Sequence, residues 1–238
     1  MSTRRVLAIF LKEAQDIRTN KNILLMYLLP FVIVIIYKNF IPNMPVGFVL
    51  SFGLMFLAAL VGMYVPAMLI AEEKEKCTLD VLMLSPATPL DIFLGKGLLT
   101  FVSIIICTVI LIFVAGSSLS GAAPIIVGMA LTAVFCINFG MIIGLLAQNQ
   151  MATGVIGTPL YMIFLLVPLL AQLSDSFITK LALLLPTHHF FNMLRLVLED
   201  GKGLGETINQ LAIILASIIV SFILLLVVYK RRGLTQDR

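Results

Sequence analysis

The sequence predicts an all-α membrane protein with six transmembrane helices. Of its 238 residues, 61% are hydrophobic and 12% are charged, whereas soluble domains have about 25% charged residues. No Asp, Glu, Lys or Arg occurs from Gly97 to Ser174, a run of 78 residues. A transmembrane helix needs about 20 apolar residues, so this run accommodates three spans joined by short turns. We treat the chain, 1–238, as a single transmembrane domain.

Apolar stretches of spanning length recur along the chain. They lie near 22–40, 48–71, 97–117, 124–147, 154–172 and 207–229. Six spans put both termini on one side of the membrane. Of the 16 Lys and Arg residues, twelve fall on that side and four on the other, so the positive-inside rule predicts cytoplasmic termini. About twenty mostly polar residues precede the first span, so no cleavable signal peptide is evident.

Residues 1–20 are predicted to form an amphipathic helix. Leu7, Phe10 and Leu11 recur at helical spacing, and charged residues occupy the positions between them. Such a helix lies in the membrane interface, in contact with lipids. Two interpretations stay open: an anchor that only orients the first span, or an elbow helix that also touches a cytoplasmic subunit.

A charged segment, Glu72–Lys76, follows the second span. At roughly 2.5 to 3.5 kcal/mol for each charge at a bilayer centre, the segment would cost on the order of 12 to 17 kcal/mol, so it lies outside the hydrocarbon. The helix of the second span is expected to break near Cys77. A short helix then bears apolar side chains on one side: Leu79, Leu82 and Met83. We therefore expect residues 72–96 to form an ordered cytoplasmic loop.

Pro86 ends this short helix, and a new helix begins soon after it. Thr88 is the predicted N-cap and Pro89 the first helical residue, with Asp91 facing back toward the cap. The chain then re-enters the membrane as the third span.

The residues from Ile70 to Pro86 read Ile-Ala-Glu-Glu-Lys-Glu-Lys-Cys-Thr-Leu-Asp-Val-Leu-Met-Leu-Ser-Pro, and Gly95-Lys96 follow. This segment resembles the cytoplasmic loop of ABC type 2 exporter permeases, which has acidic residues, then usually Gly-Thr-Leu-Glu, then Leu and a proline. Cys77 stands where glycine is common, and Asp80 where glutamate is common. The resemblance also covers the layout of the whole chain, with an elbow helix, six spans and an outer segment before the last span.

The resemblance implies a permease subunit of the bacterial inner (plasma) membrane that pairs with a second copy or a paralogue. Two ATP-binding cassette ATPase subunits would bind this pair and would hold ATP and magnesium, so no cofactor is expected on this chain. The loop after the second span would be the coupling helix. The residues expected to couple to the ATPase are Glu72, Glu73, Thr78, Leu79, Asp80, Leu82, Met83 and Pro86. No nucleic acid partner is implied.

The chain is not expected to hydrolyse ATP itself. The phosphate-binding motif G-x-x-x-x-G-K-[ST] needs a glycine five residues before its Gly-Lys pair. Leu90 occupies that place before Gly95-Lys96, and Leu196 occupies it before Gly201-Lys202. A separate nucleotide-binding polypeptide is therefore required.

The outer segment, residues 173–205, is predicted to form a re-entrant helical hairpin. Its uncharged stretch from Leu181 to Leu194 has 14 residues, too few to span a membrane, and Pro186 interrupts it. In the family such a hairpin closes the outer end of the pathway. Phe190 and Phe191 are therefore candidate pathway residues.

Two adjacent histidines in this segment invite a metal or catalytic interpretation. His188 and His189 would point about 100° apart on a helix, with no Cys, Asp or Glu at ligand spacing, so no metal site is predicted. An intramembrane enzyme could pair Ser117 or Ser118 with His188, but the Gly-x-Ser-x-Gly turn is absent around these serines. A membrane anchor that transports nothing is a further alternative.

Inside the spans, Asn138 is the most polar side chain of the fourth, and it either lines a pathway or bonds a neighbouring helix. Gly140 and Gly144 form a G-x-x-x-G pattern, predicted to be an internal packing face rather than a dimer seam. Few polar groups face the interior, so we expect a hydrophobic or amphipathic substrate such as a drug, lipid or antimicrobial peptide, and the resemblance implies that it is moved outward. A sodium-exporting permease is the alternative, and no intramembrane charge marks a proton relay.

Overall fold

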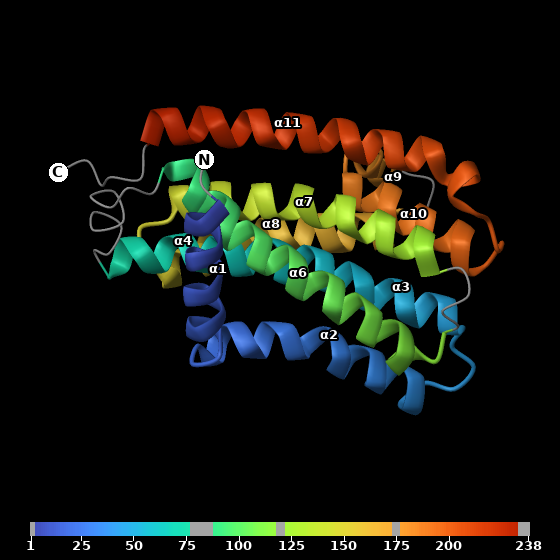
Figure 1. Ribbon diagram of the computed structural model, residues 1–238. Coiled ribbons are helices and arrows are strands. Elements are labelled where there is room, and N and C mark those ends of the chain that lie inside the picture. The colour runs from blue at the N-terminus through green and yellow to red at the C-terminus, as the bar shows by residue number, and fades with distance from the viewer. Residues whose placement is uncertain (1–2, 77–87, 118–121, 173–176, 233–238) are drawn as a thin grey trace.

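The structure, a computed structural model, describes residues 3–76, 88–117, 122–172 and 177–232, and all the regular elements in these ranges are helices (Figure 1). Six helices or runs of helix are long and apolar enough to cross a membrane. They are α2 (Lys21–Phe40), the run Val46–Glu75, α6 (Pro89–Ala115), α7 (Ala122–Leu146), α8 (Gln150–Leu170) and α11 (Ile208–Arg232). The predicted six-span, all-α fold is confirmed.

The second span is not a continuous α-helix. It consists of α3 (Val46–Phe56), a π-helical turn η1 (Leu57–Val61) and α4 (Gly62–Glu75). The π-turn comes just before Pro66, whose ring lacks an N–H and displaces the carbonyl of the residue four places earlier. The sequence predicts a single span here, near 48–71, but does not reveal the irregular turn.

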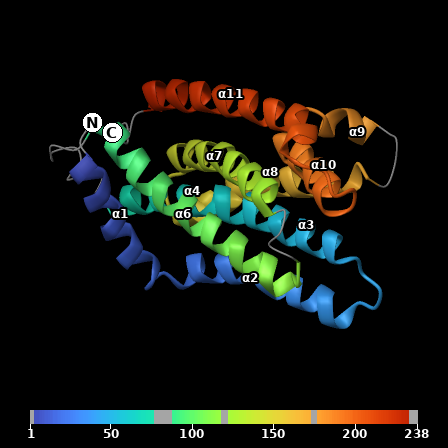
Figure 2. The same cartoon turned by 45° about the vertical axis from the view of Figure 1, so that its right-hand side comes forward.

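The spans alternate in direction along the bundle, and the first helix lies across one end of it. Helix α1 (Thr3–Ile17) crosses the end at which α4 stops and α6 starts, and α11 also finishes at this end (Figures 1 and 2). We call it the α1 end. The opposite end holds α9 (Phe177–Ala182), α10 (Pro186–Leu198) and the short 3-10 helix η2 (Leu204–Thr207). The predicted helical pair between the last two spans is therefore present, and its re-entry into the membrane stays a prediction.

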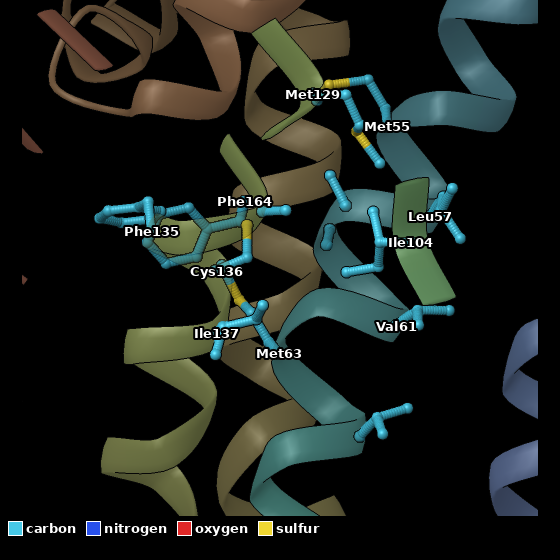
Figure 3. Close-up of a cluster of buried hydrophobic side chains, with 14 of the residues drawn as sticks. Met55, Leu57, Val61, Met63, Ile104, Met129, Phe135, Cys136, Ile137 and Phe164 are labelled. Atoms are coloured by element: carbon cyan, nitrogen blue, oxygen red, sulfur yellow. The ribbon is translucent and has the colours of Figure 1, made fainter. Parts of the chain in front are cut away.

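Helices α4 and α7 form the centre of the bundle. About two thirds of the apolar window of each of these spans is buried (67%), whereas the figure is 17% for α2 and for α11. Figure 3 shows the core between them, in which Met63 of α4 lies beside Cys136 and Ile137 of α7. The outer helices instead expose large aliphatic side chains, as expected of helices that face lipid.

The closest contact in this core depends on two glycines of α7. A Cβ atom added at Gly140 would overlap the backbone carbonyl of Met63, and one added at Gly144 would lie 2.7 Å from the carbonyl oxygen of Ala67. The absence of side chains lets the two backbones approach. The G-x-x-x-G pattern is thus an internal packing face, as predicted.

We expect Gly140→Ala to lower the free energy of unfolding by about 1–3 kcal/mol, because the added methyl group meets a backbone atom that cannot move aside. The measurement is thermal unfolding of the detergent-solubilised protein. Gly154→Ala on α8 is the matched control, since a Cβ atom there meets nothing within 4 Å. A control variant that loses as much stability as Gly140→Ala would contradict the packing interpretation.

Candidate functional site

A buried ammonium group joins three helices at the α1 end. Lys96 of α6 is only 1% exposed. Its Nζ atom donates hydrogen bonds to Glu13 Oε1 of α1 at 2.6 Å and to Glu73 Oε1 of α4 at 3.0 Å. The third bond goes to the carbonyl oxygen of Leu69 at 3.0 Å. All three donors of the ammonium are thus used, and α1, α4 and α6 share one cation.

A second lysine completes the cluster from the solvent side. Lys12 Nζ lies 2.6 Å from Glu73 Oε1, 3.1 Å from Glu13 Oε1 and 3.3 Å from Asp16 Oδ2. Burial by itself lowers the pKa of Lys12, but hydrogen bonds and charge attraction from Glu73 and Glu13 outweigh it, so the net pKa is raised. Lys12 is therefore charged at neutral pH. We call Lys12, Glu13, Asp16, Glu73 and Lys96 the Lys96 cluster.

Helix α1 reaches this cluster because α6 has a glycine beneath it. A Cβ atom at Gly95 would lie 2.7 Å from Ile9 Cγ2 and 3.2 Å from the carbonyl oxygen of Val6. Any larger residue would lift α1 away from Lys96. Gly95 thus sets the distance at which the two helices meet.

The apolar side chains predicted for the amphipathic helix do not take part in the Lys96 cluster and lie mostly on the open side of α1. Leu7 and Leu11 are 56% and 54% exposed, and Phe10 is half-buried. The face of α1 toward the bundle instead holds Val6 and Glu13. Leucines on the open side of the helix remain available to lipid, in keeping with an interfacial helix.

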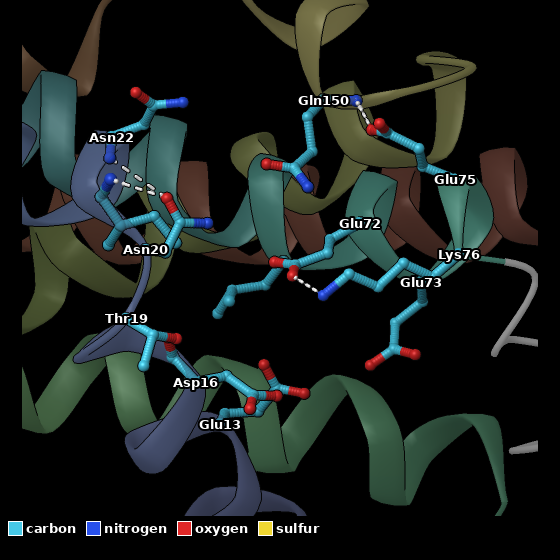
Figure 4. A network of polar contacts seen from close by, with 12 residues as sticks. Glu13, Asp16, Thr19, Asn20, Asn22, Glu72, Glu73, Glu75, Lys76 and Gln150 are labelled. Atoms are coloured by element: carbon cyan, nitrogen blue, oxygen red, sulfur yellow. Dashed lines mark hydrogen bonds and ion pairs between the residues drawn. The ribbon is translucent and has the colours of Figure 1, made fainter.

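The end of α4 is also tied to α7 and α8. Lys74 Nζ donates to the carbonyl oxygens of Gly144, Leu145 and Ala147 at 3.1, 2.5 and 3.0 Å, and so satisfies carbonyls at the end of α7. Glu75 Oε2 accepts from the backbone N–H of Gln150 at 3.0 Å, at the start of α8 (Figure 4). The charged segment thus connects α4 to four other helices, α1, α6, α7 and α8.

The sequence predicts that the charges of Glu72–Lys76 lie in water or against another protein. In the structure some of these side chains are buried and others are exposed. Glu73 is 3% exposed in the Lys96 cluster, whereas Glu72 pairs with the exposed Lys76 at 2.5 Å, as Figure 4 shows. The helix ends at Glu75, close to the predicted break. The other residues expected to couple to an ATPase lie outside the described residues: Thr78, Leu79, Asp80, Leu82, Met83 and Pro86.

The predicted start of the next helix is confirmed. The backbone N–H of Asp91 donates to Thr88 Oγ1 at 3.3 Å, and that of Thr88 donates to Asp91 Oδ2 at 3.0 Å. Pro89 begins the helix, where its missing N–H leaves no bond unmade. This capping box orients the first turn of α6 just after the charged segment.

The candidate pathway residues do not lie together. Asn138 of α7 borders a groove between α6, α7 and α11, and its Nδ2 donates to Ser221 Oγ of α11 at 3.1 Å. Asn138 therefore does bond a neighbouring helix. Phe190 and Phe191 are buried in α10 at the opposite end. His188 Nε2 forms a hydrogen bond with the side-chain amide nitrogen of Asn192, at 3.0 Å, rather than with Ser117.

A family model described as ABC-2 family transporter protein matches residues 37–227. The match covers the charged segment, α6 and the outer helical pair. No curated protein matches the sequence significantly.

We expect Lys96→Met to lower the free energy of unfolding by about 3–5 kcal/mol, because it leaves buried carboxylates with too little positive charge. The measurement is chemical unfolding in detergent. Lys76→Met is the control, since the exposed Lys76–Glu72 pair contributes at most about 1 kcal/mol. Replacing Glu13 and Glu73 by Gln together with Lys96→Met should recover most of the loss. No recovery would mean that Lys96 acts through packing alone.

Acid is expected to loosen α10 through His188. Burial, and then the nearby charge of His189, lower the pKa of His188 below its ordinary value. The neutral ring therefore contributes stability that is complete above about pH 6.5 and is lost as the pH falls through the folded-state pKa. Unfolding temperatures measured from neutral to acidic pH should fall less steeply in His188→Gln. Identical pH profiles for the two proteins would contradict this.

Proposed function

Because the chain belongs to the ABC-2 family of transporter proteins, we propose that it is the membrane-spanning permease subunit of an ATP-driven exporter. It would act with a second permease copy or paralogue and two separate ATP-binding cassette ATPases. The α1 end would face the cytoplasm of a bacterial cell. Segment 77–87, between α4 and α6, would contact the ATPase.

The observation on which this proposal depends is the Lys96 cluster. Helices α4 and α6 flank the segment expected to bind the ATPase, and Lys96 joins their ends directly through Glu73. Glu13 adds α1 to the same unit. A displacement of the segment would therefore move both spans and α1 together, rather than bend a single loose loop.

The docking energy would be of the size that such coupling needs. Three apolar side chains of the segment, Leu79, Leu82 and Met83, would each contribute about 1.5–3 kcal/mol when buried, or roughly 5–9 kcal/mol in all before docking costs. Reversing a conformational equilibrium from 1:99 to 99:1 needs about 5.5 kcal/mol. Nucleotide-driven closure of the ATPases could thus pull the second and third spans into a new arrangement.

The hydroxyl groups inside the spans are already bonded within the protein, which favours a hydrophobic or amphipathic substrate. Thr100, Thr108 and Thr132 are buried, and each donates its hydroxyl to a carbonyl four residues earlier in its own helix. Their hydrogen atoms are therefore not available to a sugar or another strongly polar cargo. Drugs, lipids and antimicrobial peptides are the substrate classes that this interior suits.

We expect Leu82→Asp to abolish co-purification of the chain with its partner ATPase, because a charge would replace an anchoring side chain. Insertion into the membrane should be unchanged. Gln148→Asp is the matched control, since Gln148 lies exposed at the α1 end in the turn between α7 and α8. Equal recovery of the ATPase with both variants would rule out docking through residues 77–87.

ATPase activity in reconstituted vesicles then tests transport itself. A hydrophobic cargo should stimulate hydrolysis by the wild-type complex and leave that of the Leu82→Asp preparation unchanged. Stimulation by sodium alone would favour the ion exporter instead.

A further inference from the structure

An apolar groove opens between α6, α7 and α11. Its volume is about 780 Å³, and apolar side chains form most of its lining. Leu94 and Leu98 come from α6, Met141 from α7, and Phe222 and Leu226 from α11. Figures 1 and 2 show α11 at one edge of the bundle, alongside α7. The groove therefore lies at the margin of the molecule, where membrane lipid is the surrounding medium.

The groove has the length of one membrane leaflet. Along α6 its lining runs from Leu90 to Phe101, about 16 Å at 1.5 Å per helical residue. The hydrocarbon core of a bilayer is about 30 Å thick, so one leaflet accounts for roughly half of it. An acyl chain from the leaflet at the α1 end would fill the groove along its whole length.

One end of the groove is basic. Lys230 of α11 lines it, and Arg231 follows on the same helix. Both side chains are exposed, and in the described part of the chain neither takes part in an ion pair. Asp91, in the first turn of α6, has other partners, because it is bonded in the Thr88 cap and lies 3.9 Å from Arg5.

The rest of the groove offers little to a polar headgroup. Asn138 lines it, but its side-chain amide already donates a hydrogen bond to Ser221. Near the basic end, the ring of Tyr229 packs edge-on against Phe93 with centroids 5.5 Å apart, and both residues line the groove. Aromatic rings of this kind gather at the level of lipid headgroups. An amphiphile can thus bind in only one orientation, with its headgroup at the Lys230 end and its apolar part along the rest of the groove.

We infer that this groove binds an anionic phospholipid from the leaflet at the α1 end, with an acyl chain along α6, α7 and α11 and its phosphate at Lys230. The groove length, the apolar lining and the cation at one end, which has no ion pair within the described residues, all match that molecule. The site is a resident lipid site. It does not depend on what the chain transports or on its association with an ATPase.

The chain has no tryptophan, so a single introduced one can report lipid contact. We would place it in the groove with Phe222→Trp and, on the lipid-facing side of α2, with Leu28→Trp as the matched control. Each protein is reconstituted in vesicles that contain brominated phosphatidylglycerol or brominated phosphatidylcholine, whose bromine atoms quench tryptophan on contact. Phe101→Trp provides a second groove reporter if the first variant does not fold.

The expected result is that phosphatidylglycerol quenches the groove reporter at about fivefold lower mole fraction than phosphatidylcholine, the ratio that one basic side chain gives at an anionic surface. The two lipids should quench Leu28→Trp nearly equally. Adding Lys230→Gln should remove the preference in the groove. Lys21→Gln, at the start of α2, should leave it unchanged.

Three results would overturn the inference. One is an equal lipid preference at the groove reporter and at the control. Another is a groove preference that survives Lys230→Gln. The third is weaker quenching in the groove than at the control by both lipids, which would show that protein rather than lipid covers this surface.

Discussion

A buried ammonium ion must be surrounded by counter-charges, and this requirement organises the α1 end of the bundle. Lys96 is stable in its position only while Glu13 and Glu73 remain within hydrogen-bonding distance, which fixes α1 and α4 against α6. Helix α4 is in turn held by the glycine face of α7, and Lys74 of α4 donates hydrogen bonds to the carbonyl oxygens at the end of α7. The ends of five helices therefore behave as one connected unit around the segment that is expected to meet the ATPase.

Much of the fold could be predicted because its signals are local. Spans are recognised by the length of their apolar runs, and the start of α6 by the order Thr88, Pro89, Asp91, which specifies a cap within four residues. The G-x-x-x-G pattern likewise indicated close packing by itself. These signals need no knowledge of which helices are neighbours.

The Lys96 cluster could not be predicted in the same way. Its charged residues come from three segments far apart in the chain, and each looked like ordinary surface charge beside a membrane span. Glu13 was especially misleading, since the leucine spacing of α1 placed it on the polar face. Gly95 was a usable signal in retrospect, because a glycine directly before a lysine at a helix start allows another backbone to approach. The groove was hidden for the same reason, as its lining comes from three helices.

The π-turn in the second span has a geometric consequence for the whole bundle. One additional residue in a turn rotates the following residues by about 100° around the helix axis. The apolar face of α4 is therefore not a continuation of the face of α3. The face of α3 packs beside α2 and α10, and that of α4 packs beside α7 and α8. Removing a single residue from Leu57–Val61 would bring both halves into one phase, which would turn Glu73 away from Lys96 and separate the glycine face from its partner.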